Sequence, residues 1–384
     1  MKKNLIFSLI FVFACSLSIL AQVQQVAGVV HNRHTINSSI LDEERTILVQ
    51  VPESYAQSNE KYPVVYMLDA HPPQNAMMVG ILEQQAWGKQ IPEMILVGIQ
   101  NINRSRDLTP TDDGKGGQVG GGDKFLDFIE KEVMPLVQKN YRTQPFRIFA
   151  GHSLGGLTVV YSFVTRPDMF NAYIAASPVL GWDNNFVIKQ AEKVFEQKKD
   201  WKKTMFLGIG DESELIKGFN SFKDLLKKSN PRGFDYEFRQ YPDDNHASVV
   251  LPAYYAGLRK IFAGWEPPQN GSVSGLENHY KKLSEKFGYE IKIPEAMLNQ
   301  AGYQFIRANN FLEAIEIFKK NAANYPNSAN VYDSLAEAYE KNGQLKQAKE
   351  NYEKAYQMAQ IQGNTQLASA SKANYERVSG KLNK

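Results

Sequence analysis

The amino-acid sequence predicts an α/β protein followed by a smaller, all-helical part. Short apolar runs alternate with helical stretches up to residue 266, and a Pro-, Gly- and Ser-rich segment spans 267–275. Beyond it, small and large apolar residues repeat with a 34-residue period. We expect a signal peptide at 1–21, an α/β domain at 22–266, a linker at 267–275 and a helical domain at 276–384.

Residues 1–21 have the pattern of a secretory signal peptide. Two lysines precede an apolar run, and small and aliphatic residues follow up to Ala21. We predict cleavage after Ala21 and a secreted or periplasmic protein. The alternative is a lipoprotein anchored through Cys15, whose preceding residues fit a lipobox poorly. No second apolar stretch of about 18 residues follows, so no membrane span is predicted.

Seven short apolar runs indicate strands. Several are continuously apolar, as strands buried on both faces of a sheet require. Apolar residues at helical spacing indicate helices at Lys124–Gln138, Leu157–Val164 and Ser221–Lys228. A mostly parallel sheet with helices on both faces is therefore predicted. The strand candidates are Thr46–Pro52, Tyr62–Leu68, Met94–Ile99, Arg147–Ala150, Ala172–Ala176, Thr204–Ile209 and Asp235–Tyr241.

The C-terminal repeat appears when Leu298–Pro326 is shifted by 34 residues onto Tyr332–Gln360. The pairs are Gly302 with Ala336, Phe305 with Tyr339, Ala314 with Ala348, and Phe318 with Tyr352. Small residues recur where two helices approach closely, and large ones where helix pairs pack together. The pattern resembles tetratricopeptide repeats, which implies about two repeats, a trailing helix at Thr365–Ser379 and a surface for a protein or peptide partner.

The composition excludes several classes of function. The net charge is only +3 and no basic block occurs, so we expect no nucleic-acid partner. The single cysteine, Cys15, excludes an intramolecular disulfide framework and a Cys-based zinc site. The Gly-rich segment 114–122 lacks the ending of a phosphate-binding loop, and His31 and His34 are predicted to be solvated at a strand edge. Neither a cofactor nor a metal ion is expected.

The segment Gly151-His152-Ser153-Leu154-Gly155-Gly156 carries the strongest chemical signal. It lies between a predicted strand and a predicted helix, where a sharp turn presents a nucleophilic serine. Small residues let the strand and the helix come close, and the helix N-terminus favours a negatively charged oxyanion. We predict Ser153 as the nucleophile and the amide of Leu154 as one oxyanion donor.

Serine needs a base to take its proton, and a histidine late in the chain is expected after such a turn. His246 lies in the loop after the last predicted strand, whereas His279 lies beyond the linker. We therefore predict His246 as the catalytic base.

The acid that orients the histidine should follow the strand ending at Ile209. Asp211, Glu212 and Glu214 are all available there. We choose Glu212 and keep Asp211 and Glu214 as alternatives.

The second oxyanion donor should come from the loop after Tyr62–Leu68. Pro72 and Pro73 have no N–H group, so the amide belongs to His71 or Ala70. We propose a backbone role for His71, whose side chain can line the pocket.

Three side chains are candidates for substrate binding. Arg104 and Arg106 suit an acidic or polyhydroxylated substrate, and Trp182 suits an acyl or aryl group. The alternatives are an internal pairing of these arginines with Asp107 and a structural tryptophan.

Four blocks occur in order along the chain: Tyr62–Asp69, Asn103–Pro110, Gly151–Gly156 and Ala176–Pro178. Together they resemble the esterase family of α/β hydrolases, which includes esterase D, enterochelin-type siderophore esterases, feruloyl and acetyl-xylan esterases and mycobacterial mycolyltransferases. The resemblance covers about residues 30–262. It implies an α/β-hydrolase fold, a Ser-His-acid triad and His71 as the source of the second oxyanion amide. Ala70 stands where the family often has glycine.

The predicted function is a secreted or periplasmic serine esterase that cleaves a small-molecule ester through an acyl-enzyme. Siderophore lactones, acyl sugars and short acyl esters all fit the same residues. One alternative is a scaffold protein whose repeats bind a partner and whose hydrolase domain is inactive. Another is an acyltransferase that uses the same triad.

Overall fold

The computed structural model describes residues 22–26, 29–197, 200–268 and 272–383. Contacts between residues divide the chain into a first unit, 1–263, and a second unit, 264–384. The predicted signal peptide lies outside the described residues, as do residues 269–271 of the predicted linker.

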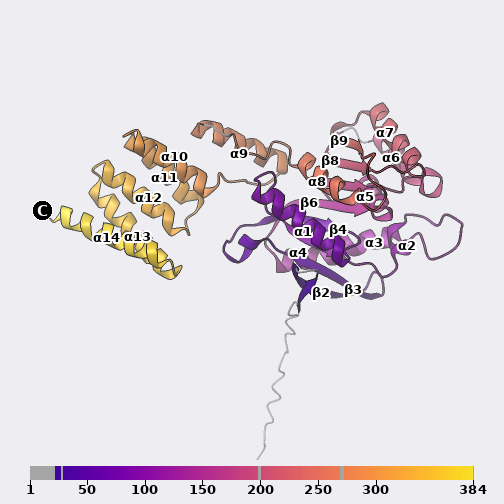
Figure 1. Ribbon diagram of the computed structural model, residues 1–384, viewed down its shortest axis with the longest axis horizontal. Helices are drawn as coiled ribbons and strands as arrows, with labels where there is room; N and C mark the ends of the chain where they lie inside the picture. Colours follow the sequence, from indigo (N-terminus) through magenta and orange to yellow (C-terminus); the bar gives the residue numbers. More distant parts are fainter. Residues whose placement is uncertain (1–21, 27–28, 198–199, 269–271, 384) are drawn as a thin grey trace, which may run out of the picture. The chain divides into compact units, whose positions relative to one another are not determined.

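The first unit is built on a nine-stranded sheet of order β1-β2-β3-β5-β4-β6-β7-β8-β9 (Figure 1). Strands β1, β2, β3 and β5 pair antiparallel, and β5, β4, β6, β7, β8 and β9 pair parallel in that order. The strands are β1 Gln22–Val26, β2 Val29–Ser38, β3 Glu43–Gln50, β4 Tyr62–Met67, β5 Ile95–Ile99, β6 Thr143–His152, β7 Ala172–Ala176, β8 Asp200–Ile209 and β9 Arg232–Gln240.

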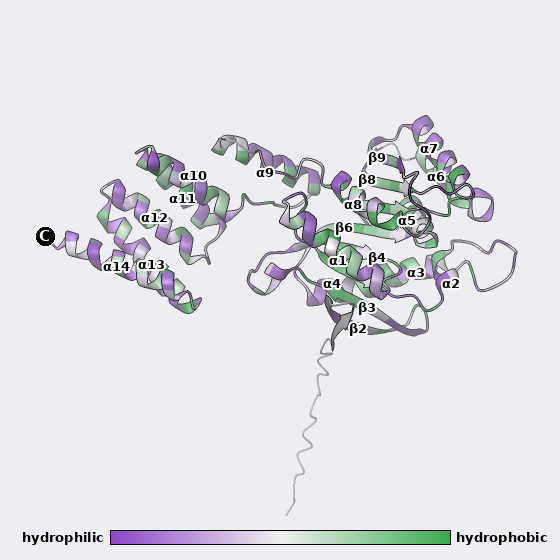
Figure 2. Cartoon of the chain, viewed as in Figure 1, coloured by the Kyte–Doolittle hydropathy of each residue, from purple (hydrophilic) through white to green (hydrophobic). Residues whose placement is uncertain are grey.

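Each predicted strand overlaps one of β3 to β9, and the prediction of a mostly parallel sheet is confirmed. Figure 2 shows much of β4, β6 and β8 in the colour of hydrophobic residues, whereas the edge strand β9 is mostly polar and its residues are largely exposed or half-buried. Strands β1 and β2 were not predicted, because their sequences mix polar and apolar residues without a continuous apolar run.

Helices cover both faces of the sheet, as predicted. On β7, Tyr173 belongs to the large core cluster that includes α5, whereas the next residue, Ile174, lies against Gly257 of α8. Because α8 also contacts α1, these two helices form one layer, and α5, α6 and α7 form the other. The helices are α1 Pro72–Trp87, α2 Arg104–Leu108, α3 Gly122–Phe128, α4 Met134–Asn140, α5 Leu154–Thr165, α6 Trp182–Gln197, α7 Ile216–Ser229 and α8 Val250–Ile261.

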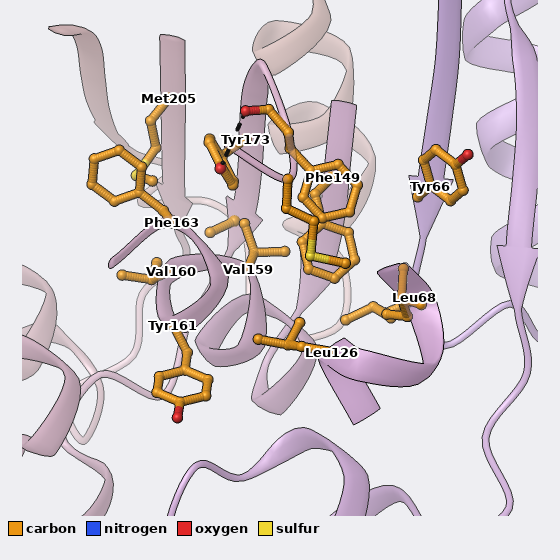
Figure 3. Packing of buried hydrophobic residues seen from close by; sticks show 14 of the residues in the cluster. Tyr66, Leu68, Leu126, Phe149, Val159, Val160, Tyr161, Phe163, Tyr173 and Met205 are labelled. Carbon is orange, nitrogen blue, oxygen red and sulfur yellow. Dashed lines mark hydrogen bonds between the residues drawn. The ribbon is translucent and has the colours of Figure 1, made fainter. Parts of the chain in front are cut away.

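The core beneath α5 is dense and aromatic. Figure 3 shows Val159 and Phe163 of α5 beside Phe149 of β6 and Tyr173 of β7. The rings of Phe163 and Tyr173 meet edge to face with centroids 5.3 Å apart. This packing holds the middle and the C-terminal half of α5 against the sheet.

His31 and His34 on β2 are buried, so the prediction that they are solvated is wrong. His31 Nε2 lies 3.1 Å from Asn75 Nδ2 of α1, and His34 Nε2 lies 2.6 Å from the hydroxyl of Tyr141. Burial lowers the pKa of both imidazoles. Segments distant in sequence cover this strand, and such cover is not visible in the local sequence.

A buried ion pair joins β3 to the segment after β5. Arg45 Nη1 lies 2.7 Å from Asp107 Oδ2, and both side chains are almost fully shielded from solvent. Glu43 is a second partner of Arg45, at 2.8 Å. The pair fixes the short helix α2, which precedes the Gly-rich loop.

The variant Asp107→Asn is expected to lower the free energy of unfolding of the first unit by about 3 kcal/mol, because it removes one partner of a buried charge. Asp235→Asn is the matched control, since Asp235 pairs with Lys260 on the surface; its cost should stay below about 1 kcal/mol. Urea denaturation followed by circular dichroism measures both. Equal destabilisation by the two variants would contradict the stabilising role of the buried Arg45–Asp107 pair.

The second unit is helical, as predicted. Its helices are α9 Val273–Phe287, α10 Glu295–Arg307, α11 Phe311–Asn324, α12 Ala329–Lys341, α13 Leu345–Ile361 and α14 Thr365–Leu382, and α10 to α14 each contact the next. Gly302 packs so closely on Phe318 that a Cβ there would lie 2.5 Å from the ring. Within the described residues, no helix combines the length and apolarity needed to cross a bilayer.

Candidate active site

Ser153 occupies a strained turn between β6 and α5. Its backbone has φ 61° and ψ −119°, a conformation that costs a residue with a side chain about 1–3 kcal/mol. Its amide donates to Ala176 O at 2.9 Å, which ties the turn to β7. A Cβ on Gly151 would lie 2.4 Å from Gly155 O, so glycine is required there. The small residues of the motif therefore permit the close approach of strand and helix.

His246 and Glu212 come together from the loops after β9 and β8. His246 Nδ1 lies 2.5 Å from Glu212 Oε2, and the proton belongs on Nδ1 because an ionised carboxylate only accepts. The Glu212 side chain is only 9% exposed. By contrast, the residues Asp211 and Glu214 are exposed.

Two further donors hold Glu212 in place. Its Oε1 accepts from the hydroxyl of Ser177 and from the amide of Gly210, the latter at 3.1 Å. The carboxylate thus has partners on both oxygens, which fixes its orientation toward His246. Sequence reasoning missed Ser177, although it lies in the Ala176–Pro178 block.

A cavity of about 290 Å³ brings Ser153 and His246 to one place. Its wall also includes Asp69, His71, Arg104 and Tyr254. Among the described residues, the Ser153 hydroxyl makes no hydrogen bond to His246. Such bonds are often long in unliganded enzymes and tighten when substrate binds.

Two backbone amides lie in the segments expected to bind an oxyanion. Leu154 is the first residue of α5, where helical N–H groups lack acceptors within the helix. The amide of His71 already donates to Asp69 O at 2.7 Å, and that of Ala70 to Ile99 O at 3.2 Å. The His71 amide would therefore have to share or leave this carbonyl in order to bind an oxyanion.

Arg104 lines the cavity and braces the turn at Asp69. Its Nε lies 2.7 Å from Asp69 Oδ1 and its Nη2 2.9 Å from Oδ2, a two-pronged pairing. Asp69 has φ 55°, so the pairing supports a backbone conformation that is unfavourable for aspartate. The Arg104 side chain remains 36% exposed and can reach a bound molecule.

Arg106 and Trp182 are not among the described residues that line the cavity. Arg106 Nη2 lies 2.6 Å from Glu43 Oε1, and its Nε donates to Asp107 Oδ1 at 2.7 Å. The indole N–H of Trp182 donates to Thr111 Oγ1 at 3.2 Å. Arg106 and Trp182 therefore make internal contacts, the alternative that the sequence had left open for each.

His152, the residue before Ser153, also lines the cavity. Its Nε2 lies 2.7 Å from the backbone oxygen of His246, and the two imidazole centroids are 4.5 Å apart. Burial, together with the charge of His246, lowers the pKa of His152 to about 4. Sequence reasoning treated His152 only as part of the turn, although its place beside the nucleophile was a usable signal.

The sheet order, with its serine at the β6–α5 turn, is that of an α/β hydrolase. The sequence model of the family described as "Putative esterase" matches residues 38–257. The chain belongs to this family.

Similar proteins agree with this assignment. Ferri-bacillibactin esterase BesA of Bacillus subtilis is 29% identical over 226 residues, which cover 52% of this chain and 78% of the relative. The siderophore triacetylfusarinine C esterase of Aspergillus fumigatus is 41% identical over 196 residues, with coverages of 44% and 67%. A crystal structure of an IroE-like serine hydrolase from Shewanella oneidensis has a TM-score of 0.68 and 30% identity, and the match covers 76% of this chain and 99% of that one. The chain is a carboxylic ester hydrolase.

Proposed function

We propose that the protein hydrolyses esters through an acyl-enzyme formed on Ser153, with His246 as the base and Glu212 as the orienting acid. The observation that carries this proposal is the His246–Glu212 pair, of which His246 lines the same cavity as the strained serine. Few structural roles require a serine in a strained backbone conformation close to an imidazole that is hydrogen-bonded to a carboxylate.

The proposed reaction has two halves. Ser153 Oγ attacks the ester carbonyl while His246 Nε2 takes its proton, and the amides of Leu154 and His71 hold the oxyanion. The intermediate collapses when His246 returns the proton to the leaving alcohol. Water then attacks the acyl-enzyme by the same route and releases the acid, so Ser153 regains its proton. An alcohol in place of this water would give acyl transfer with the same residues.

We propose siderophore esters as the first substrates to test, because two relatives carry siderophore esterase names. Arg104 at the cavity wall suits a substrate that bears negative charge or many hydroxyl groups. Acyl sugars and short acyl esters belong in the same panel, since pocket shape decides specificity.

We also propose that residues 1–21 direct secretion, and that the second unit consists of tetratricopeptide-like repeats that bind a protein or peptide. In support of the repeats, the paired positions Gly302 and Ala336, and Phe318 and Tyr352, are all buried between helices. The proposed hydrolysis does not require a partner bound to these repeats.

A fluorophosphonate probe tests the proposed chemistry. The full chain is expected to label with one adduct, on the peptide that contains Ser153, because only an activated serine reacts at a useful rate. Mass spectrometry locates the adduct, and turnover is then scored over ferric catecholate lactones, feruloyl and acetyl sugars and p-nitrophenyl esters. An unlabelled Ser153 in a folded protein would refute the proposal.

A further inference from the structure

His152 holds the backbone of the residue proposed as the base. The loop after β9 is tied to the β8 side by Asp211 N, which donates to Asp244 O at 2.7 Å. The bond from His152 Nε2 to His246 O ties the same loop to the turn after β6, at the residue next to Ser153. It is therefore a direct link between the base loop and the nucleophile turn.

His246 needs such a link, because burial alone does not immobilise it. Its side chain is 44% exposed, and its contact with Glu212 fixes only the Nδ1 side of the ring. The imidazole of His152 lies beside that of His246 at 4.5 Å with the planes tilted by 45°. A hydrogen bond to the backbone and a ring contact together restrict where Nε2 of His246 can point.

We propose that His152 is a positioning residue, which anchors the His246 backbone so that the imidazole reaches the Ser153 hydroxyl. This inference rests on the proposed function and adds a residue to it. A carbonyl only accepts, so the proton of His152 must sit on Nε2. The main chain of His152 is itself held, because its carbonyl accepts from Arg104 Nη2 at 3.2 Å.

The charge state of His152 suits this role. With its pKa lowered to about 4 by burial and by His246, the imidazole is neutral at neutral pH. His246 can then become positively charged during turnover without a charged His152 beside it, and Glu212 can stabilise that charge. His152 itself does not exchange protons with the substrate.

Three variants test the anchor. His152→Leu keeps part of the side-chain contact with the His246 imidazole but loses the N–H donor. Its kcat should fall by about 10- to 100-fold while KM stays within about threefold, as expected for a misplaced base. His152→Gln carries an N–H near the position of Nε2 and should recover most of kcat. His152→Asn has the same amide on a shorter chain that cannot reach His246 O, and should resemble His152→Leu.

Thermal unfolding is measured for each variant, so that activity is compared between folded proteins. Recovery by Gln but not by Asn or Leu supports the anchor. Wild-type kcat in a folded His152→Leu variant, or a Gln variant as slow as the Leu variant, would overturn it. Labelling of the unaltered chain with the fluorophosphonate separates the two proposals. An unreactive Ser153 means that the proposed function fails. A reactive Ser153, together with His152 variants whose kcat is unchanged, means that only this inference fails.

Discussion

Ser153→Ala is expected to lower kcat/KM for a p-nitrophenyl acyl ester by at least about 10³-fold, because no other group can then form the acyl-enzyme. The side chain is small and the backbone keeps its angles, so the fold should persist. Residual activity should come only from the oxyanion donors and substrate binding. Steady-state hydrolysis and fluorophosphonate labelling of the same samples check the result.

Ser221→Ala is the matched control for this variant. Its hydroxyl bonds to Lys217 O at 3.0 Å on α7, away from the residues that line the cavity. Its activity should equal that of the unaltered chain. Near-full hydrolysis by a folded Ser153→Ala variant would remove the nucleophile assignment and leave only the esterase fold.

Glu212→Gln is expected to lower kcat by about 10³- to 10⁴-fold. If the amide N–H group faces His246 Nδ1, the imidazole must place its proton on Nε2, which can then no longer accept the proton of Ser153. If the amide oxygen faces Nδ1 instead, the negative charge that stabilises the imidazolium is still lost. Substrate binding does not depend on this carboxylate, so KM should change little.

Asp211→Asn and Glu214→Gln provide controls within the same loop. Both residues are exposed, so each variant should stay within about twofold of the unaltered kcat. A low kcat for one of these, with near-normal kcat for Glu212→Gln, would reassign the acid. A pH profile of all three variants separates a lost base from general destabilisation.

Much of the fold could be predicted, because burial on both faces leaves a mark on local sequence. The apolar run at Ala172–Ala176 coincides with β7, and the small residues around Ser153 predict the turn that the structure has there. Strand β2 escaped prediction, since its buried residues His31 and His34 are shielded by residues from α1 and from the end of α4. When segments distant in sequence bury a polar strand, the strand itself shows no periodic pattern of apolar residues.

The site was predictable to the level of loops and less so to the level of side chains. The sequence left Asp211, Glu212 and Glu214 as alternatives, and the contact of Glu212 with His246 depends on donors from two other segments. For the same reason, nothing near Arg106 in the sequence revealed Glu43 as its partner across the sheet. Spacing identifies which loops meet, whereas the partners of each side chain are set by the folded whole.

The left-handed backbone at Ser153 has one more implication. Glycine would accept φ 61° without the penalty that a Cβ brings, so the residue best suited to the stability of this turn is one that lacks a hydroxyl. The protein thus keeps a local conformational stress at the point where the proposed chemistry begins. Protein engineers who select only for heat resistance would be drawn toward an inert variant at this position.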